Sequence, residues 1–62
     1  MFEAYPEIVT VSDLQEMLNI GRNTAYKLVK SGGIKAFYAG GKLRITKSEI
    51  IKFIESGGSK HD

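Results

Sequence analysis

The chain has 62 residues, of which 42% are hydrophobic, and its nine basic and seven acidic side chains give a net charge of +2. A chain of this length folds as one domain with a thin core, and without cysteine it has neither a disulfide framework nor a thiolate metal site. Its apolar runs are too short for a secretory signal or for a membrane span of about 20 residues, so we expect a cytoplasmic protein.

The charges are segregated along the chain. No acidic residue lies between Glu16 and Glu49, and the basic residues of that interval are Arg22, Lys27, Lys30, Lys35, Lys42, Arg44 and Lys47. This pattern indicates a polyanionic partner, because neutralised phosphates release counterions and so favour binding. The alternative is a solvated basic face without a partner.

The N-terminal third predicts a loose lead-in over residues 1–7, a short β-branched strand over residues 8–10 and a helix over residues 13–18. Ser12 and Gln15 have the spacing of a capping box, and Thr10 is the alternative cap. The apolar stripe of this helix consists of Leu14, Met17 and Leu18.

A second helix is predicted over residues 22–30, after a three-residue break at positions 19–21. Its apolar face carries Ala25, Leu28 and Val29, and Ser31-Gly32-Gly33 ends it. Two short helices joined by a tight turn that contains an apolar residue are typical of a helix-turn-helix.

From Ile34 the hydrophobic period changes from 3.6 to 2, which predicts a β-hairpin. Gly40-Gly41 suits a two-residue primed turn. A third helix follows, with Thr46 and Glu49 at capping-box spacing. We expect these apolar residues of the hairpin and of the third helix to be buried: Phe37, Leu43, Ile45, Ile50, Phe53 and Ile54.

The predicted fold class is therefore mainly α with a small β-hairpin, a winged helix-turn-helix of three short helices and a two-stranded wing. We expect one domain over residues 1–62, ordered over about 8–56, with frayed ends at 1–6 and 58–62.

The sequence also resembles a known family. The order Thr10-Val11, then Asp13 to Leu18, then Asn19 to Val29 is similar to the helix-turn-helix of the excisionase family. Residues 36–45 resemble its wing, and residues 48–54 resemble its closing helix. The resemblance covers about residues 9–54. It implies a winged helix distantly similar to the DNA-binding part of the MerR regulators, with the second helix in the major groove and the wing at phosphates or the adjacent minor groove.

The residues expected to bind double-stranded DNA are, in the second helix, Arg22, Asn23, Thr24, Tyr26, Lys27 and Lys30, and in the wing, Gly40, Gly41, Lys42 and Arg44. Tyr26 has two interpretations: its hydroxyl contacts a phosphate, or its ring packs beside the wing. For Lys27 and Lys30 the alternative is a solvated helix surface, and for Lys42 and Arg44 it is a positively charged hairpin edge that keeps the protein soluble.

Neither catalysis nor a cofactor or metal is expected, because no phosphate-loop or metal-ligand spacing occurs and the single histidine, His61, lies at the C-terminus. The favoured function is an excisionase-like recombination directionality factor that binds and bends DNA, with an integrase as a further partner. A small transcription repressor is the alternative, and a protein-interaction adaptor with a basic face is the third hypothesis. We expect a nucleoid-associated protein that is monomeric in solution and pairs on DNA.

Overall fold

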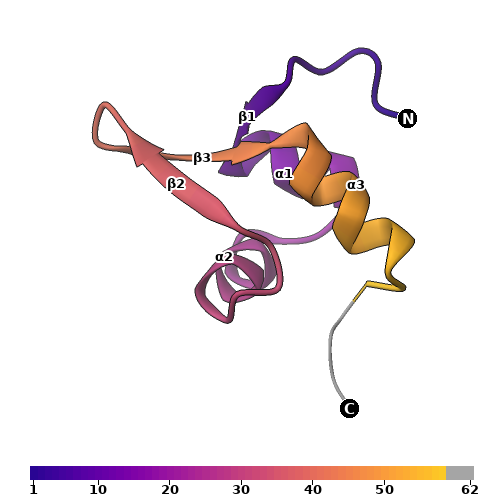
Figure 1. Ribbon diagram of the computed structural model, residues 1–62. Coiled ribbons are helices and arrows are strands. Elements are labelled where there is room, and N and C mark those ends of the chain that lie inside the picture. Colours follow the sequence, from indigo (N-terminus) through magenta and orange to yellow (C-terminus); the bar gives the residue numbers. More distant parts are fainter. Residues whose placement is uncertain (59–62) are drawn as a thin grey trace.

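The computed structural model describes residues 1–58 of the chain (Figure 1). In chain order its elements are β1 (Ile8–Thr10), α1 (Val11–Leu18), α2 (Arg22–Lys30), β2 (Ala36–Ala39), β3 (Lys42–Thr46) and α3 (Lys47–Glu55). This architecture confirms the predicted winged helix-turn-helix. The tail at positions 59–62, predicted to be frayed, lies outside the described residues.

The three strands form one antiparallel sheet in the order β1-β3-β2. The predicted hairpin supplies β2 and β3, and β1 pairs with the other edge of β3 through Val9 opposite Ile45. The ladder between β1 and β3 ends at Thr10 opposite Arg44, where the chain enters α1. The tip of the hairpin therefore continues past β1 as a two-stranded wing, which projects from the body of the domain in Figure 1.

The core lies between one face of this sheet and the three helices. Its fully or almost fully buried members are Val9, Val11, Leu14, Ala25, Ile34, Ile45 and Ile50. Each predicted helical stripe contributes one of them, and its other members pack partly buried around this centre. Seven small and medium-sized side chains make a thin core, as expected for a domain of this size.

Helix α1 begins at Val11, two residues before the predicted start, and its cap is Thr10 rather than Ser12. Thr10 Oγ1 accepts a hydrogen bond from the Asp13 amide, and the Asp13 carboxylate accepts one from the Thr10 amide, both at 3.1 Å. The pairing of Thr10 in the sheet explains this choice, because it holds the residue in the extended conformation that an N-cap requires.

The cap of α3 is the predicted residue, but only half of the predicted box forms. Thr46 Oγ1 accepts from the Glu49 amide at 3.3 Å. The Glu49 carboxylate lies instead 3.5 Å from the Lys52 ammonium, so it is paired within its own helix.

The prediction that Phe37 lies in the core is wrong, since its side chain is 40% exposed. In the register of the hairpin Phe37 is opposite Arg44, on the outer face of the sheet, whereas Tyr38 is opposite Leu43 on the face toward the helices. The alternation of apolar and polar residues in β2 does not reveal this, because both Phe37 and Tyr38 are aromatic and either could have faced inward.

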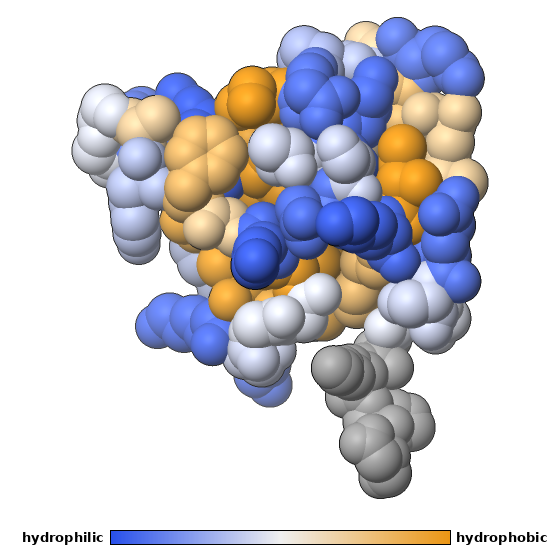
Figure 2. Space-filling view, viewed as in Figure 1, coloured by the Kyte–Doolittle hydropathy of each residue, from blue (hydrophilic) through white to orange (hydrophobic). Residues whose placement is uncertain are grey.

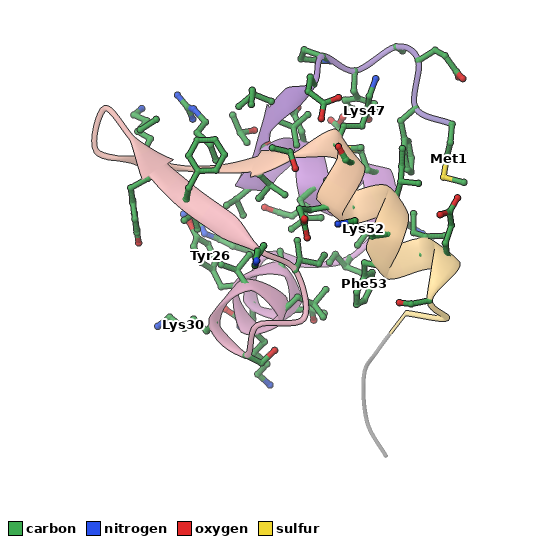
Figure 3. The ribbon with its side chains drawn as sticks, viewed as in Figure 1. Met1, Tyr26, Lys30, Lys47, Lys52 and Phe53 are labelled. Atoms are coloured by element: carbon green, nitrogen blue, oxygen red, sulfur yellow. The ribbon has the colours of Figure 1, made fainter. Side chains whose placement is uncertain are left out.

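The N-terminal lead-in makes more contacts than its sequence suggested. The Lys47 ammonium donates to the carbonyl oxygens of Phe2 and Tyr5 at 3.3 and 3.0 Å, and the Tyr5 hydroxyl donates to Glu16 at 3.1 Å. The rings of Phe2 and Tyr5 meet edge to face, with their centroids 6.0 Å apart. These contacts hold the segment across the start of α3, where Figure 3 shows Lys47 beneath it.

Candidate nucleic-acid interface

The turn between α1 and α2 sets the position of the second helix. Asn19 has left-handed backbone angles (φ 56°, ψ 51°), and the Ile20 amide donates to the Gln15 carbonyl at 2.9 Å, which closes the end of α1. Ile20 packs partly buried against the core. This hydrogen bond and the packing of Ile20 fix the conformation of the turn, so α2 starts at a fixed angle to α1, as in a helix-turn-helix.

The first turn of α2 presents its polar side chains to solvent. Arg22, Asn23 and Thr24 are exposed, whereas Ala25 is completely buried beneath them. The Arg22 guanidinium carbon lies 5.6 Å from the centroid of the Tyr26 ring, within the range of a cation–π contact. This contact limits the orientations of Arg22 before any partner binds.

The two lysines of α2 project from the helix surface. Lys27 and Lys30 are both exposed, and Lys30 extends away from the core in Figure 3. Thr24, Lys27 and Lys30 line one shallow concavity along α2. Lys30 also lines a hollow beside the wing, so the predicted helix contacts extend from the wing side of α2 around its surface.

The wing turns through the two predicted glycines, both with positive φ. Gly40 (φ 60°) and Gly41 (φ 78°) occupy a two-residue loop between the paired Ala39 and Lys42, the conformation of a type I′ turn. No atom lies within 4 Å of a Cβ built on either glycine, so the tip stands clear of the domain. Lys42 is exposed at this tip.

The wing and the two helices of the helix-turn-helix enclose a shallow open hollow of about 630 Å³. We call it the arginine hollow, because Arg22 of α2 and Arg44 of β3 are among the residues that line it. Lys42 adds a third cation, and Ser12 and Gln15 line it from α1. No acidic residue among positions 1–58 lines it.

A second hollow of about 530 Å³ lies on the other side of the same junction. We call it the lysine hollow, because Lys30 and Lys35 are its charged residues. Three side chains line both hollows and separate them, and we call these the tyrosine ridge: Tyr26, Tyr38 and Leu43. Figure 2 shows hydrophilic side chains over much of the visible face, with hydrophobic ones exposed between them.

Two of the lining residues, Lys35 and Tyr38, were not among the predicted contacts. Lys35 belonged to the acid-free interval, so the charge pattern could have indicated it. Tyr38 gave no signal, because only the register of the hairpin shows that it shares the helix-facing side of the sheet with Leu43. Both predicted interpretations of Tyr26 fit, since its ring lies beside the wing at the edge of two basic hollows.

The cations of the two hollows have no acidic partner in the described residues 1–58. The ion pairs of this part of the chain join the N-terminus to Glu3 and Lys52 to Glu49, away from the wing. Lys47 belongs to the same acid-free interval, but its ammonium is bonded to backbone carbonyls of the lead-in. It is therefore a structural residue rather than a part of the basic surface.

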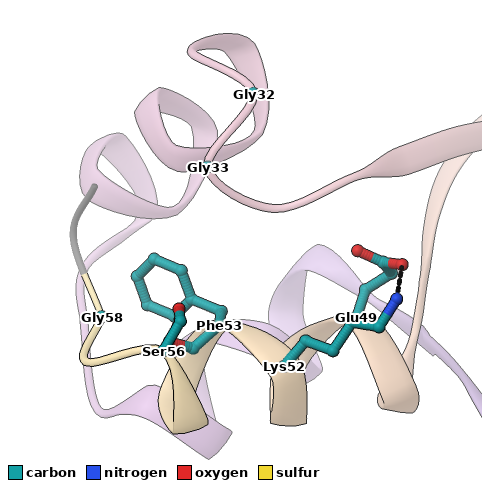
Figure 4. A pocket seen from close by; sticks show the side chains of 7 residues that line it. All are labelled: Gly32, Gly33, Glu49, Lys52, Phe53, Ser56 and Gly58. Atoms are coloured by element: carbon teal, nitrogen blue, oxygen red, sulfur yellow. Dashed lines mark hydrogen bonds and ion pairs between the residues drawn. The ribbon is translucent and has the colours of Figure 1, made fainter. Parts of the chain in front are cut away.

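Another concavity, between α3 and the turn after α2, has a different character (Figure 4). Phe53 lines it together with the glycines of that turn, and Lys52 and Glu49, which also line it, pair with each other. Within residues 1–58, the side of the molecule formed by α2 and the wing combines hollows with unpaired positive charge, whereas this concavity does not.

No helix within residues 1–58 has the length and hydrophobicity needed to cross a membrane. In the same part of the chain, no three side chains of the His, Cys, Asp or Glu type come together as a metal site.

Comparison with known families identifies this arrangement. The profile of the helix-turn-helix domain family matches residues 8–58, from the first residue of β1 to the turn beyond α3. The chain therefore belongs to the helix-turn-helix domain family, and its partner is DNA. No curated protein and no solved structure matches it significantly.

Proposed function

We propose that this helix-turn-helix domain is an excisionase-like recombination directionality factor, which binds a specific DNA site and bends it without catalysing a reaction. The observation that carries the proposal is the placement of α2 and the basic wing on either side of one acid-free concave surface. The likeness of residues 9–54 to excisionases, and more distantly to the DNA-binding part of MerR regulators, supports the same function. An integrase is the protein partner that this function requires.

In the proposed complex the first turn of α2 enters the major groove. Arg22 and Asn23 then reach base edges, since arginine pairs with guanine and asparagine with adenine in that groove. The wing reaches the adjacent minor groove through Lys42 and Arg44, beside a glycine tip that allows close approach to the backbone. A bend that brings both grooves toward the protein adds contacts that offset the deformation energy of about 1–6 kcal/mol.

The salt dependence of the affinity for duplex DNA distinguishes the DNA-binding hypothesis from the adaptor hypothesis. The two hollows hold five cations: Arg22, Lys30, Lys35, Lys42 and Arg44. If each neutralises one phosphate, log affinity for duplex DNA falls against log salt concentration with a slope of about −4 to −5. A slope near zero on DNA, together with tight binding to an acidic protein, would favour the adaptor.

A bending measurement tests the excision role against a simple repressor. A footprint on the DNA flanking the gene defines the site, which is then placed at different positions in fragments of equal length. A bend makes the gel mobility of the complex depend on that position. Mobility that does not depend on position would contradict bending and favour a regulator that only occupies a promoter.

We also propose that the free protein is a monomer and that copies pair on adjacent sites, where DNA raises their local concentration. The apolar faces of the short helices are directed into the core, which leaves little area for a stable interface of about 1,200 Å² or more. Sedimentation at tens of micromolar should show a species of 6.9 kDa. A tight dimer without DNA would contradict this and favour a conventional repressor.

A further inference from the structure

The proposed complex places α2 in one groove and the wing in the next, but it gives no role to the tyrosine ridge between them. Tyr26, Tyr38 and Leu43 lie between the helix and the wing, with the arginine hollow on one side and the lysine hollow on the other. Tyr38 is the most exposed large side chain of the ridge, at 75%. Tyr38 therefore offers an accessible aromatic ring and a hydroxyl between two basic hollows.

The geometry of duplex DNA suggests what covers it. The major and minor grooves are separated by a sugar–phosphate strand, so a protein that enters two adjacent grooves must straddle that strand. Here the helix and the wing are the two parts that enter, and the ridge is the surface between them. On this basis, which rests on the proposed function, the strand must cross the ridge.

We propose that the tyrosine ridge is the seat of one sugar–phosphate strand and that Tyr38 is a DNA-binding residue of this protein. The Tyr38 hydroxyl donates to a phosphate oxygen, and its ring packs against deoxyribose. The cations of the two hollows, three on one side of the ridge and two on the other, hold the phosphates before and after it. Leu43, cross-strand neighbour of Tyr38, supports the ring from the wing.

The charges favour a strand of DNA over other occupants. Within the part of the chain that the structure describes, five cations and no carboxylate line the two hollows, and no acidic group is in ion-pair contact with them. The ring and hydroxyl of Tyr38, set between these cations, suit a strand with charged phosphates and apolar sugar faces.

This role differs from that of the lysines and arginines in a measurable way. A tyrosine hydroxyl binds a phosphate without neutralising its charge, so it contributes affinity but releases no counterion. It also contacts the backbone rather than a base, so it carries no information about sequence.

The test compares three variants in binding to the footprinted duplex at several salt concentrations. Tyr38→Phe should bind about three- to tenfold more weakly, and Tyr38→Ala about tenfold or more, on specific and random duplexes alike. The salt slope should stay unchanged in both. Ile8→Ala is the control, because it removes an exposed hydrophobic side chain of the same sheet from β1, at a position that lines neither hollow, and it should leave affinity unchanged. Thermal unfolding of each variant confirms that the domain remains folded.

A duplex with single methylphosphonate linkages then locates the contact. One linkage next to the α2 footprint should weaken binding of the native protein but add little to the defect of Tyr38→Phe, since both changes remove the same hydrogen bond. Unchanged affinity of both Tyr38 variants, while the native protein binds with a steep salt slope, would overturn this inference and leave the proposed function standing. A changed site preference in Tyr38→Phe would also overturn it, because it would place the residue at a base. Failure of the native protein to bind duplex DNA would remove both proposals.

Discussion

The two ends of this molecule use their lysines in opposite ways. At the end formed by α3 and the N-terminal segment, Lys47 bonds to two backbone carbonyls and Lys52 pairs with Glu49. At the end formed by α2 and the wing, Lys30 and Lys42 are exposed and have no carboxylate partner among residues 1–58. The lysines at one end are therefore bonded within the protein, whereas those at the other end are available to a partner.

The comparison shows why charge segregation in a sequence locates an interface only approximately. Lys47 and Lys42 belong to the same acid-free interval and lie five positions apart. One follows the end of β3 and enters α3 beneath the lead-in, whereas the other begins β3 at the tip of the wing. The role of each lysine is thus decided by which carbonyls or phosphates it can reach.

The largest effect should come from a change that removes the framework shared by both ends. Leu14 is fully buried, and Leu14→Ala should lower the free energy of unfolding by about 2–5 kcal/mol. A domain of this size has little more stability than that, so chemical denaturation should show a largely unfolded variant. Glu55→Ala, at an exposed position of α3, is the control and should change stability by less than about 0.5 kcal/mol. A folded Leu14→Ala protein with native stability would contradict the assigned core.

At the wing end, the helix and the hairpin should contribute differently to DNA recognition. Asn23→Ala or Arg22→Ala should reduce the preference for the specific site by about 1–3 kcal/mol, because a side chain that reads a base is lost. Lys42→Ala should weaken specific and random duplexes about equally. Competition binding with a randomised site measures both effects. The assignment is reversed if Lys42→Ala shifts the preferred site and Asn23→Ala does not.

A pair of matched substitutions tests the contrast between the two ends directly. Lys47→Met keeps the apolar stem but removes the ammonium, and it should cost about 1–2 kcal/mol of stability because two hydrogen bonds to the lead-in are lost. Its salt slope for DNA should be unchanged. Lys42→Met should leave stability within about 0.5 kcal/mol and flatten the slope by about one.

Denaturation curves and salt titrations of the two variants are to be compared side by side. If Lys47→Met flattened the slope while unfolding like the native protein, Lys47 would be a DNA contact and the division between the two ends would be incorrect.

The smallest effect concerns the residue that joins the sheet to the helix-turn-helix. Thr10→Ala should lower stability by about 1 kcal/mol, because it removes the acceptor for the Asp13 amide at the start of α1. Ser12→Ala should not, since Ser12 follows the cap and is exposed. Equal losses for both variants in thermal unfolding would show that α1 can use either cap.

Much of the fold follows from local patterns in the sequence. The stripe of Ala25, Leu28 and Val29 defines α2 with the predicted bounds, because apolar residues at this spacing can share a face only in a helix. Gly40-Gly41 defines the hairpin turn, since two successive positive φ angles suit glycine. These are signals within a few residues of the chain, and they also indicate the basic wing and the exposed first turn of α2.

The tertiary structure decided what depends on partners far apart in the chain. Thr10 caps α1 because Arg44, 34 positions later, pairs with it and holds it extended. Phe37 is exposed and Tyr38 joins the interface because the register with β3 turns one of two neighbouring aromatic residues toward the helices. Lys47 does not contribute to the basic surface because its ammonium donates hydrogen bonds to the carbonyl oxygens of Phe2 and Tyr5, from the opposite end of the sequence. A one-residue change of register would exchange the two faces of a strand. The carbonyl that binds the Lys47 ammonium lies 45 residues away in the sequence. No local sequence pattern contains either piece of information.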